Sequence, residues 1–408
     1  MSGMFVAACA ALCGWYLASA EGAVEVSIIH FNDFHARFEP VNPVTAGKCE
    51  KGAEDTCVGG FARMHAKILE LKKQEPNALV INAGDVFTGT LWFNLFKWNV
   101  TAEFMNLLPV DAQTIGNHEF DIEGPQAVLR YLSLIKKETP TVLSNVDSTN
   151  VPELQKYLKK STIVRKGDLR IGIVGYVSTM FPVFSCESGN LSINFFARNL
   201  ATSRYLNLLT PDFCKIIFFP GTPPLSTDKP AGLYPTVITQ QGGRKVLIVQ
   251  ALAYSKYMGF LKVKFEKIAG QYQVSSWEGN PILLDKTVRT DPAIEAKLQP
   301  WRSDVDLIGS KVVGNTLVDL DATNWVCHLE ACTIGKMLTD AMVYEVITSL
   351  RLRFVLFCKN SVANIRHITR KCLHNPFEFK KYSNQGKKRA RSCWMIWNFR
   401  ILCGHGRF

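Results

Sequence analysis

The sequence predicts an α/β protein, and three observations support this fold class. Strand-like segments alternate with helix-like segments between residues 24 and 176, which is typical of sheets flanked by helices. Polar residues follow directly after three of these strands, where open α/β sheets place their ligands. The chain has 408 residues, of which 47% are hydrophobic and 20% charged, so it is long enough for two domains with a large buried core.

Short apolar or alternating runs predict strands, whereas apolar residues repeated about every 3.6 positions predict helices. The expected strands span residues 24–31, 78–82, 112–115, 141–143, 161–164, 170–176, 233–240, 245–249, 254–265 and 277–284. The expected helices span residues 61–73, 103–108 and 124–136. Residues 194–220 show neither periodicity clearly, and the chain from residue 346 is basic and without a regular pattern.

The positive charge of the chain is confined to its C-terminal end. The formal net charge is +12, but residues 346–408 hold 14 Lys or Arg and a single acid, Glu378, and therefore carry +13. The remaining 33 basic and 34 acidic residues give −1. A neutral body argues against a nucleic-acid or membrane-surface partner, and only the basic run 386–391 resembles a nucleic-acid patch.

The N-terminus resembles an export signal. Residues 4–20 are apolar and end in Ala18-Ser19-Ala20, a small-x-small cleavage pattern, and the stretch is too short for a stable membrane span. The alternative is a buried first strand or helix. We therefore expect a signal peptide at residues 1–20 and a secreted, extracellular protein.

The 12 cysteines fit a secreted protein, because disulfides persist in oxidising surroundings outside the cell. Two cysteine pairs are close in sequence, and each is expected to form a local disulfide: Cys49 with Cys57, and Cys327 with Cys332. Glycosylation sequons begin at Asn99 and Asn190, which is compatible with secretion.

Three of the predicted strands end in residues that can bind metal ions. Asp33 and His35 follow the first strand, and residues i and i+2 of an extended segment project to the same side. Asp85 follows the second strand and is the natural bridging carboxylate, while Asn117 after the third offers a neutral oxygen. Hydrolysis of a phosphate ester needs charged oxygens neutralised and a water activated, and a pair of divalent cations does both.

The residue after Asn117 suits a role toward the substrate. His118 can donate a proton or stabilise charge on the leaving group if Asp121 holds its ring. Taken singly, these signals have an ordinary alternative, because an Asp after a strand is commonly a cap or turn residue and a lone His is commonly a surface or core residue. The order of these segments and the identity of their residues together are a more specific signal than any of these residues alone.

With these motifs the chain resembles the secreted 5′-nucleotidase/apyrase family, a branch of the calcineurin-like metallophosphoesterases. The resemblance covers roughly residues 24–345 with one interruption. It rests on the segments HFNDFHARFE (30–39), NAGD (82–85), GNHEFD (116–121), LSNV (143–146), YPTV (234–237), VQA (249–251) and CHLEAC (327–332).

The resemblance implies a metallophosphoesterase sandwich of two mixed sheets flanked by helices at residues 24–285, and a fragment of a nucleotide-binding domain at 286–345, before an unmatched tail at 346–408. It also implies removal of phosphate from extracellular AMP, ADP or ATP, with two divalent cations (Zn²⁺, Mn²⁺, Mg²⁺ or Ca²⁺) as cofactors. By motif, the metal ligands are Asp33, His35, Asp85 and Asn117. The catalytic pair is His118 with Asp121.

The chain departs from the family pattern in two places. The family completes its metal site with two further histidines, in Gly-His-Ser and Gly-Gly-His segments, but none of the eight His lies between His118 and His328. The stretch 194–220 occupies their place and is too short to hold them, so the second metal site is expected to be incomplete. The family's base-binding residues also have no match after Glu345, so the substrate-binding residues and the oligomeric state stay open.

These departures leave three hypotheses. The first is a secreted metal-dependent nucleotide phosphohydrolase, impaired in this chain. The second is a catalytically defective relative that acts only by binding a metal or a partner. The third, a basic nucleic-acid binder, rests on the tail alone and is the weakest.

Overall fold

A computed structural model describes residues 22–177, 194–195, 216–218, 228, 232–322, 327 and 330–359. The chain forms two compact units, Met1–Asn315 and Thr316–Phe408, and each is described by itself. The expected signal peptide, the sequon at Asn190, most of the stretch 194–220 and the basic run 386–391 lie outside the described residues. The domain limits expected from the sequence stay a prediction.

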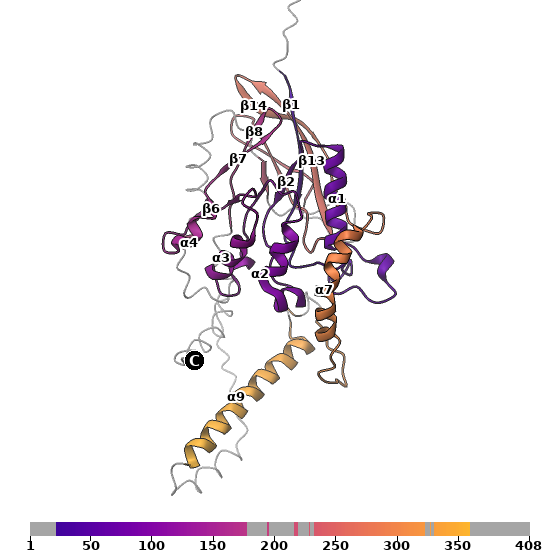
Figure 1. Ribbon diagram of the computed structural model, residues 1–408, viewed down its shortest axis with the longest axis vertical. Coiled ribbons are helices and arrows are strands. Elements are labelled where there is room, and N and C mark those ends of the chain that lie inside the picture. Colours follow the sequence, from indigo (N-terminus) through magenta and orange to yellow (C-terminus); the bar gives the residue numbers. More distant parts are fainter. Residues whose placement is uncertain are drawn as a thin grey trace, which may run out of the picture. The chain divides into compact units, whose positions relative to one another are not determined.

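The first unit is built around one mixed sheet (Figure 1). Its strand order is β14-β13-β1-β2-β3-β4-β6, and β15 pairs with β13. Strands β1, β2, β3, β4 and β6 run parallel, whereas β13 pairs antiparallel with β1. The strands are β1 (Val24–Phe31), β2 (Leu79–Asn82), β3 (Ala112–Gln113), β4 (Thr141–Val142), β6 (Leu158–Lys159), β13 (Tyr257–Ile268), β14 (Gln271–Glu278) and β15 (Pro281–Leu283).

Smaller strand groups complete this unit. Strand β12 (Lys245–Val249) lies between β10 (Ile216–Phe218) and β11 (Thr236–Thr239) in a three-stranded mixed sheet. Two antiparallel pairs are formed by β5 (Val146–Asp147) with β9 (Asn194–Phe195), and by β7 (Thr162–Lys166) with β8 (Leu169–Ile173). The predicted α/β class, with a mixed central sheet and flanking helices, is confirmed.

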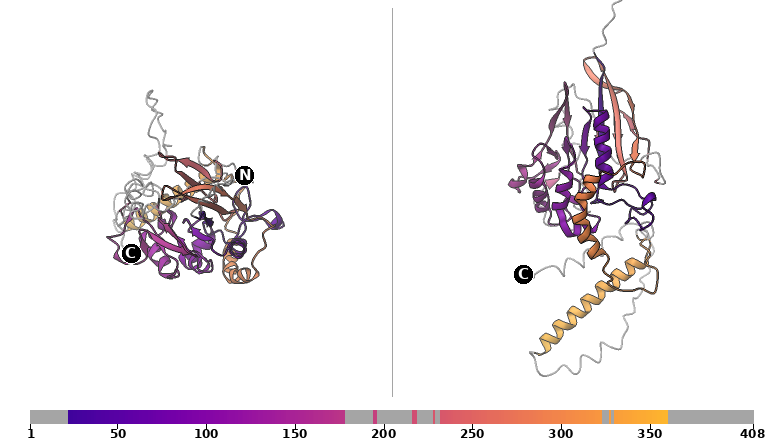
Figure 2. Two further views of the ribbon diagram at one scale, coloured as in Figure 1. Left: turned by 90° about the horizontal axis from the view of Figure 1, so that it is seen from above. Right: turned by 45° about the vertical axis from the view of Figure 1, so that its right-hand side comes forward.

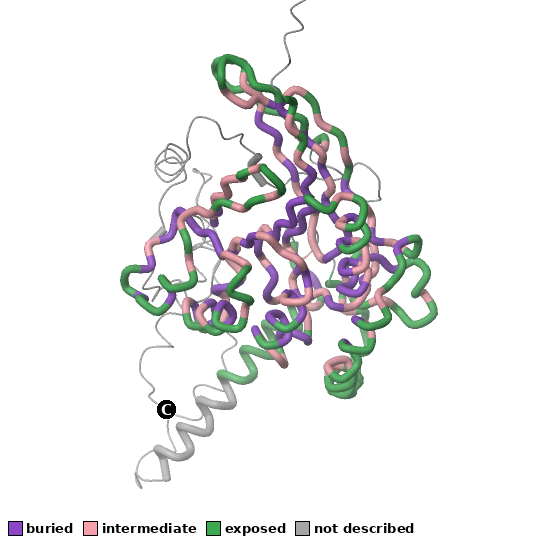
Figure 3. The backbone as a smooth tube through the Cα atoms, turned by 45° about the horizontal axis from the view of Figure 1, so that its top comes forward, coloured by how far each residue is buried: buried purple, intermediate pink, exposed green. Residues whose placement is uncertain are grey.

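Helices bury one apolar face of the central sheet, whereas residues of β7 and β8 pack against Ile28, Leu79 and Ile81 on the other. The helices are α1 (Phe61–Gln74), α2 (Leu91–Met105), α3 (Pro125–Leu134), the short α4 (Pro152–Gln155) and α7 (Pro292–Gly309). Helix α7 packs against α1 and α2, as two views show (Figures 1 and 2). Its start is fixed by Asp291, whose side chain accepts the amides of Ala293 and Ile294. The centre of the unit is buried and its outer turns are exposed (Figure 3).

Some elements differ from the sequence expectation for clear reasons. The helix expected at 103–108 overlaps only the end of α2, which begins at Leu91 and ends at Met105. Buried side chains lie on several sides of α2 and the backbone is non-helical at Lys97, so its sequence lacks a one-sided apolar stripe. The strand expected at 277–284 is divided between β14 and β15 by a turn at Gly279, whose φ of 133° suits glycine. Helices α7 and α9 (Thr333–Lys359) had not been predicted.

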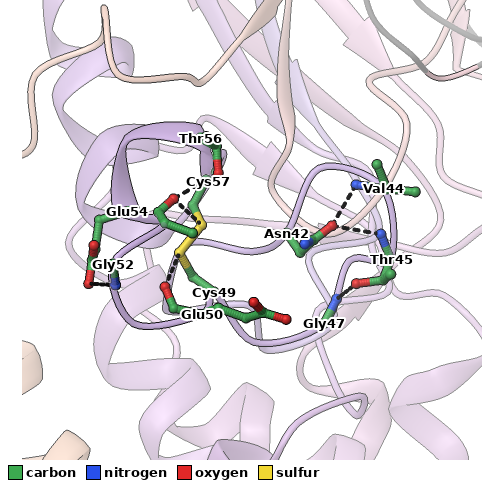
Figure 4. Close-up of a disulfide and its surroundings, with 12 residues drawn as sticks. Asn42, Val44, Thr45, Gly47, Cys49, Glu50, Gly52, Glu54, Thr56 and Cys57 are labelled. Carbon is green, nitrogen blue, oxygen red and sulfur yellow. Dashed lines mark hydrogen bonds between the residues drawn. A yellow bond between two sulfur atoms is a disulfide. The ribbon is translucent and has the colours of Figure 1, made fainter.

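Both predicted local disulfides are present, Cys49–Cys57 in the first unit and Cys327–Cys332 in the second. The first closes a surface loop next to a turn in which Asn42 Oδ1 accepts the amides of Val44 and Thr45 (Figure 4). Across the described part of the chain, no helix combines the length and the apolar character needed to cross a membrane.

Candidate functional site

The predicted site residues follow β1, β2 and β3, which are parallel neighbours, so their carboxyl ends meet at one edge of the sheet. Backbone hydrogen bonds tie the first two segments together directly. The amide of Asp33 donates to the carbonyl of Gly84 at 2.9 Å, and the amide of His35 donates to the carbonyl of Asp85 at 3.1 Å. The first two segments are therefore held in register by their main chains.

Three side chains at this edge form a group that can hold a cation. One ligand atom from each of His35, Asp85 and His118 lies within 4.8 Å of the other two. The imidazole rings of His35 and His118 meet edge to face, with their centroids 4.9 Å apart. His118, which the sequence places in the catalytic pair, therefore also lies among the metal-ligating groups.

A hydrogen bond at Nδ1 orients each of the two rings. His35 Nδ1 lies 3.2 Å from the carbonyl of Phe87, and since a carbonyl only accepts, the proton is on Nδ1 and Nε2 is free to bind a metal. His118 Nδ1 lies 2.5 Å from Asp121 Oδ2, which directs Nε2 of that ring away from Asp121. The His118–Asp121 contact expected from the sequence is thus present in the structure.

Asp33 and Asn117 lie beside this group. Asp33 Oδ1 is 3.7 Å from His35 Nε2, and Asn32 Nδ2 donates to Asp33 Oδ2 at 2.5 Å. Asn117 immediately precedes the 3₁₀ turn η2 (His118–Phe120), and its carbonyl accepts the amide of Phe120. The roles of Asp33 and Asn117 as metal ligands stay predictions.

The backbone at the site is strained in a way that brings the ligands together. Asp33, His35 and Asp85 all adopt positive φ angles of 50°, 49° and 55°, which are uncommon for residues other than glycine and concentrate at functional sites. Gly116 is required by crowding, because a Cβ atom there would lie 1.9 Å from Asp85 Oδ1. The Asp85 side chain thus lies directly over the backbone of the next ligand segment.

Burial and neighbouring groups raise the pKa values of three side chains at the site. Burial raises the pKa of Asp85, and the nearby Asp33 carboxylate raises it further. Burial likewise raises the pKa of Glu119 to about 7, with a further contribution from Asp85, while backbone amides act against the shift. The hydrogen bond to Asp121 raises the pKa of His118 to about 9. Carboxylates crowded in this way are stabilised by a bound cation.

The donor set fits one divalent cation. Ligand atoms that bind a common cation at about 2.1 Å are at most about 4.2 Å apart, so the group of His35, Asp85 and His118 needs to contract by only about half an ångström. With His118 in its neutral form, the two imidazole nitrogens and one carboxylate oxygen suit a transition metal such as Zn²⁺ or Mn²⁺. The Asp33 carboxylate lies at the same edge, 3.7 Å from His35 Nε2.

Three side chains near the ligands were not singled out from the sequence. Glu119 is buried below the site and bonds to backbone amides. Tyr254 donates its amide to the carbonyl of Asp33 at 2.7 Å and places its ring 5.5 Å from that of His35. The guanidinium of Arg37 lies 4.9 Å from the centre of the Tyr254 ring. The signal available for Glu119 was its place in the GNHEFD segment (116–121).

Comparison with known proteins agrees with this geometry. Residues 26–212 match the family model described as calcineurin-like phosphoesterase. The chain carries a calcineurin-like phosphoesterase domain. It is 36% identical to the 5′-nucleotidase-related protein of Glossina morsitans morsitans, in an alignment that covers 78% of this chain and 62% of that protein.

Further relatives carry nucleotidase or apyrase names. The apyrase of Tabanus yao is 34% identical over 79% of this chain and 62% of its own length, and the human 5′-nucleotidase is 32% identical over 81% and 62%. The solved 5′-nucleotidase precursor from Thermus thermophilus matches with a TM-score of 0.69 and 25% identity, over 80% of this chain and 68% of that one. The chain thus spans about three-fifths of the length of the curated relatives it matches.

Proposed function

We propose that the chain is a metal-dependent nucleotide phosphohydrolase of the 5′-nucleotidase/apyrase type, impaired in turnover, and that it is secreted. The observation that carries the proposal is the convergence of His35, Asp85 and His118, together with the His118–Asp121 hydrogen bond. Relatives named 5′-nucleotidase and apyrase, at 32–36% identity, support the nucleotide substrate class.

In this proposal the metal ligands are Asp33, His35, Asp85 and Asn117. Divalent cations, when bound, neutralise charge on the phosphate oxygens and lower the pKa of water. His118 holds a proton at Nε2 and donates it to the leaving oxygen of the substrate. Asp121 accepts from Nδ1 and so fixes the ring orientation and favours the protonated form.

Impairment is proposed because the chain offers few ligands for a second cation. None of its eight His lies between His118 and His328, so the two histidines that the family supplies from the later part of the domain have no counterpart. One cation is then held by the described donors, and the second site stays incomplete. A site with one cation neutralises less charge in the transition state, which lowers turnover.

Secretion and domain organisation complete the proposal. The apolar N-terminus and the two disulfides support export. We assign residues 24–285 to the phosphoesterase domain and 286–345 to the beginning of a nucleotide-binding domain, followed by the unmatched tail 346–408.

The test is phosphate release by the full chain after treatment with a chelator. AMP, ADP and ATP are each supplied with Zn²⁺, Mn²⁺, Mg²⁺ or Ca²⁺, and His118→Asn serves as the inactive reference. Metal-dependent release that is lost in the reference supports the proposal. Cation binding without release from any nucleotide supports the alternative, a catalytically defective relative that acts by binding alone.

A further inference from the structure

The two loops that carry Asp85 and His118 are joined by a side chain outside the proposed ligand set. Glu119 is 1% exposed and lies in η2. Its Oε1 accepts the amides of Val86 at 2.7 Å and Phe87 at 2.9 Å. Its Oε2 accepts the amides of Asp85 at 3.1 Å and Gly116 at 2.7 Å. One carboxylate thus receives four main-chain hydrogen bonds.

The distribution of these bonds over the two oxygens is informative. Both amides bound to Oε1 belong to the loop after β2, which we call the Asp85 loop (residues 83–87). Oε2 bonds to this loop and also to the loop after β3, which we call the Gly116 loop (residues 114–118). A single atom, Glu119 Oε2, therefore fixes the separation of the two loops.

The loops leave little room for any other arrangement. A Cβ atom on Gly84 would lie 2.7 Å from the amide nitrogen of Gly116, so the two main chains are in direct contact. The amide of His118 also donates to Asp85 Oδ1 at 3.0 Å. A shift of the Gly116 loop would therefore move both His118 and its contact with Asp85.

We propose that Glu119 is a positioning residue that sets the spacing between Asp85 and His118 by clamping the main chains of the two loops. This inference rests on the proposed function, because the spacing matters only if a cation bound at Asp85 lies beside the proton-donating His118. Charge-assisted bonds from a buried carboxylate to amides are strong, and second-layer groups that orient metal ligands affect metal affinity directly.

Two substitutions separate the geometry of the clamp from its charge. Glu119→Gln keeps the length but replaces one oxygen with an amide group, which faces two N–H donors and cannot accept from them. Glu119→Asp keeps the charge but is one methylene shorter, so it cannot reach both loops. Glu123→Gln is the matched control, because Glu123 is four residues away, exposed and paired with Arg130 at 3.4 Å.

The readout is calorimetric binding of Mn²⁺ to the full chain after chelator treatment. We expect Glu119→Gln and Glu119→Asp each to bind Mn²⁺ about 10- to 100-fold more weakly than the wild type, and Glu123→Gln to bind as the wild type does. Wild-type affinity in Glu119→Asp would show that charge alone is needed and would overturn the clamp. Wild-type affinity in both Glu119 variants would overturn it as well.

A second measurement uses the wild type alone and does not depend on how the variants fold. The amides of Val86 and Phe87 in the metal-free chain should exchange with solvent as slowly as those of β2, because they donate to a buried carboxylate. Exchange at the rate of an exposed loop would overturn the clamp. If the wild type binds no Mn²⁺ while these amides are protected, the proposed function fails and the clamp stands.

Discussion

Two groups of carboxylates in the first unit differ in how their negative charge is neutralised. Glu39 and Glu295 share one cation of the chain: Arg302 donates to Glu39 Oε1 at 2.8 Å and to Glu295 Oε2 at 2.8 Å. Asp33 and Asp85 sit at the site edge, and in the part of the chain that the structure describes neither forms an ion pair with Lys or Arg.

This difference separates a structural cluster from a functional one. A structural cluster carries its own neutralising charge and is complete when the chain has folded. The site edge instead gathers negative charge around imidazole donors, and burial and mutual repulsion raise the pKa of Asp85. The neighbouring imidazoles offset part of this repulsion, and a cation from outside the chain stabilises the arrangement further.

The largest expected effect is that of removing charge from the site edge. We expect Asp85→Asn to weaken Mn²⁺ binding by at least about 100-fold, since direct ligands matter at least as much as the groups behind them. The same change should raise the melting temperature of the metal-free protein, because it removes repulsion with Asp33. Calorimetry and thermal unfolding with and without Mn²⁺ measure both effects. A metal-free protein that melts at a lower temperature would contradict the comparison.

The structural cluster should respond in the opposite way. Arg302→Met leaves Glu39 and Glu295 without their shared partner, and we expect it to lower the free energy of unfolding by about 2 kcal/mol, which allows for the partial exposure of these side chains. Mn²⁺ affinity should stay within about twofold of the wild type. Urea unfolding and calorimetry measure the two quantities. A loss of Mn²⁺ affinity as large as that of Asp85→Asn would show that the two clusters do not differ in function.

A smaller effect is expected from His30, which lies in β1 three residues before Asp33 and remains uncharged. Burial lowers the pKa of His30 to about 3, and its ring lies against Gly259, where a Cβ atom would clash with Nε2 at 2.0 Å. The unfolded chain binds a proton at His30 near pH 6.5, whereas the folded chain does not. The burial of neutral His30 therefore costs almost no stability above about pH 6.5, and the free energy of unfolding decreases as the pH falls below that value.

The corresponding loss for His30 is about 1 kcal/mol between pH 7 and pH 5.5. We expect His30→Gln, although less stable overall, to lose about 1 kcal/mol less than the wild type over this interval, because glutamine does not titrate. Urea unfolding of the metal-free proteins at several pH values measures how steeply the free energy of unfolding changes with pH. Equal slopes would show that His30 is protonated in the folded chain.

Much of the site was predictable because its residues lie in short segments directly after strands. The strand at 24–31 and the contact between His118 and Asp121 were found from the sequence, because apolar runs and local motifs report on neighbours along the chain. The role of Glu119 was not found, because three of its four partners are main-chain amides 32–34 residues away, and a sequence pattern does not report contacts to main-chain amides.

Two other features could not be predicted from the sequence, because they depend on tertiary contacts. The start of α2 at Leu91 was missed because buried side chains lie on several sides of the helix. Tyr254 reaches the edge only because its loop turns back to the carbonyl of Asp33. The roles of Asp33 and Asn117 stay predictions from motif, since the contacts of their side chains do not distinguish a metal ligand from a turn residue.

The position of β1 in the sheet has a consequence for the order of events during synthesis. All three ligand-bearing segments emerge from the ribosome early, but β1 lies between β2 and β13, and β13 begins only at Tyr257. Asn32, next to Asp33, also bonds to the carbonyl of Leu252 at 2.6 Å and to the amide of Ala251 at 3.0 Å. The nascent chain must therefore close a loop of more than two hundred residues before Asp33 is fixed, and the last component of the cation site to arrive is a strand that contributes no ligand.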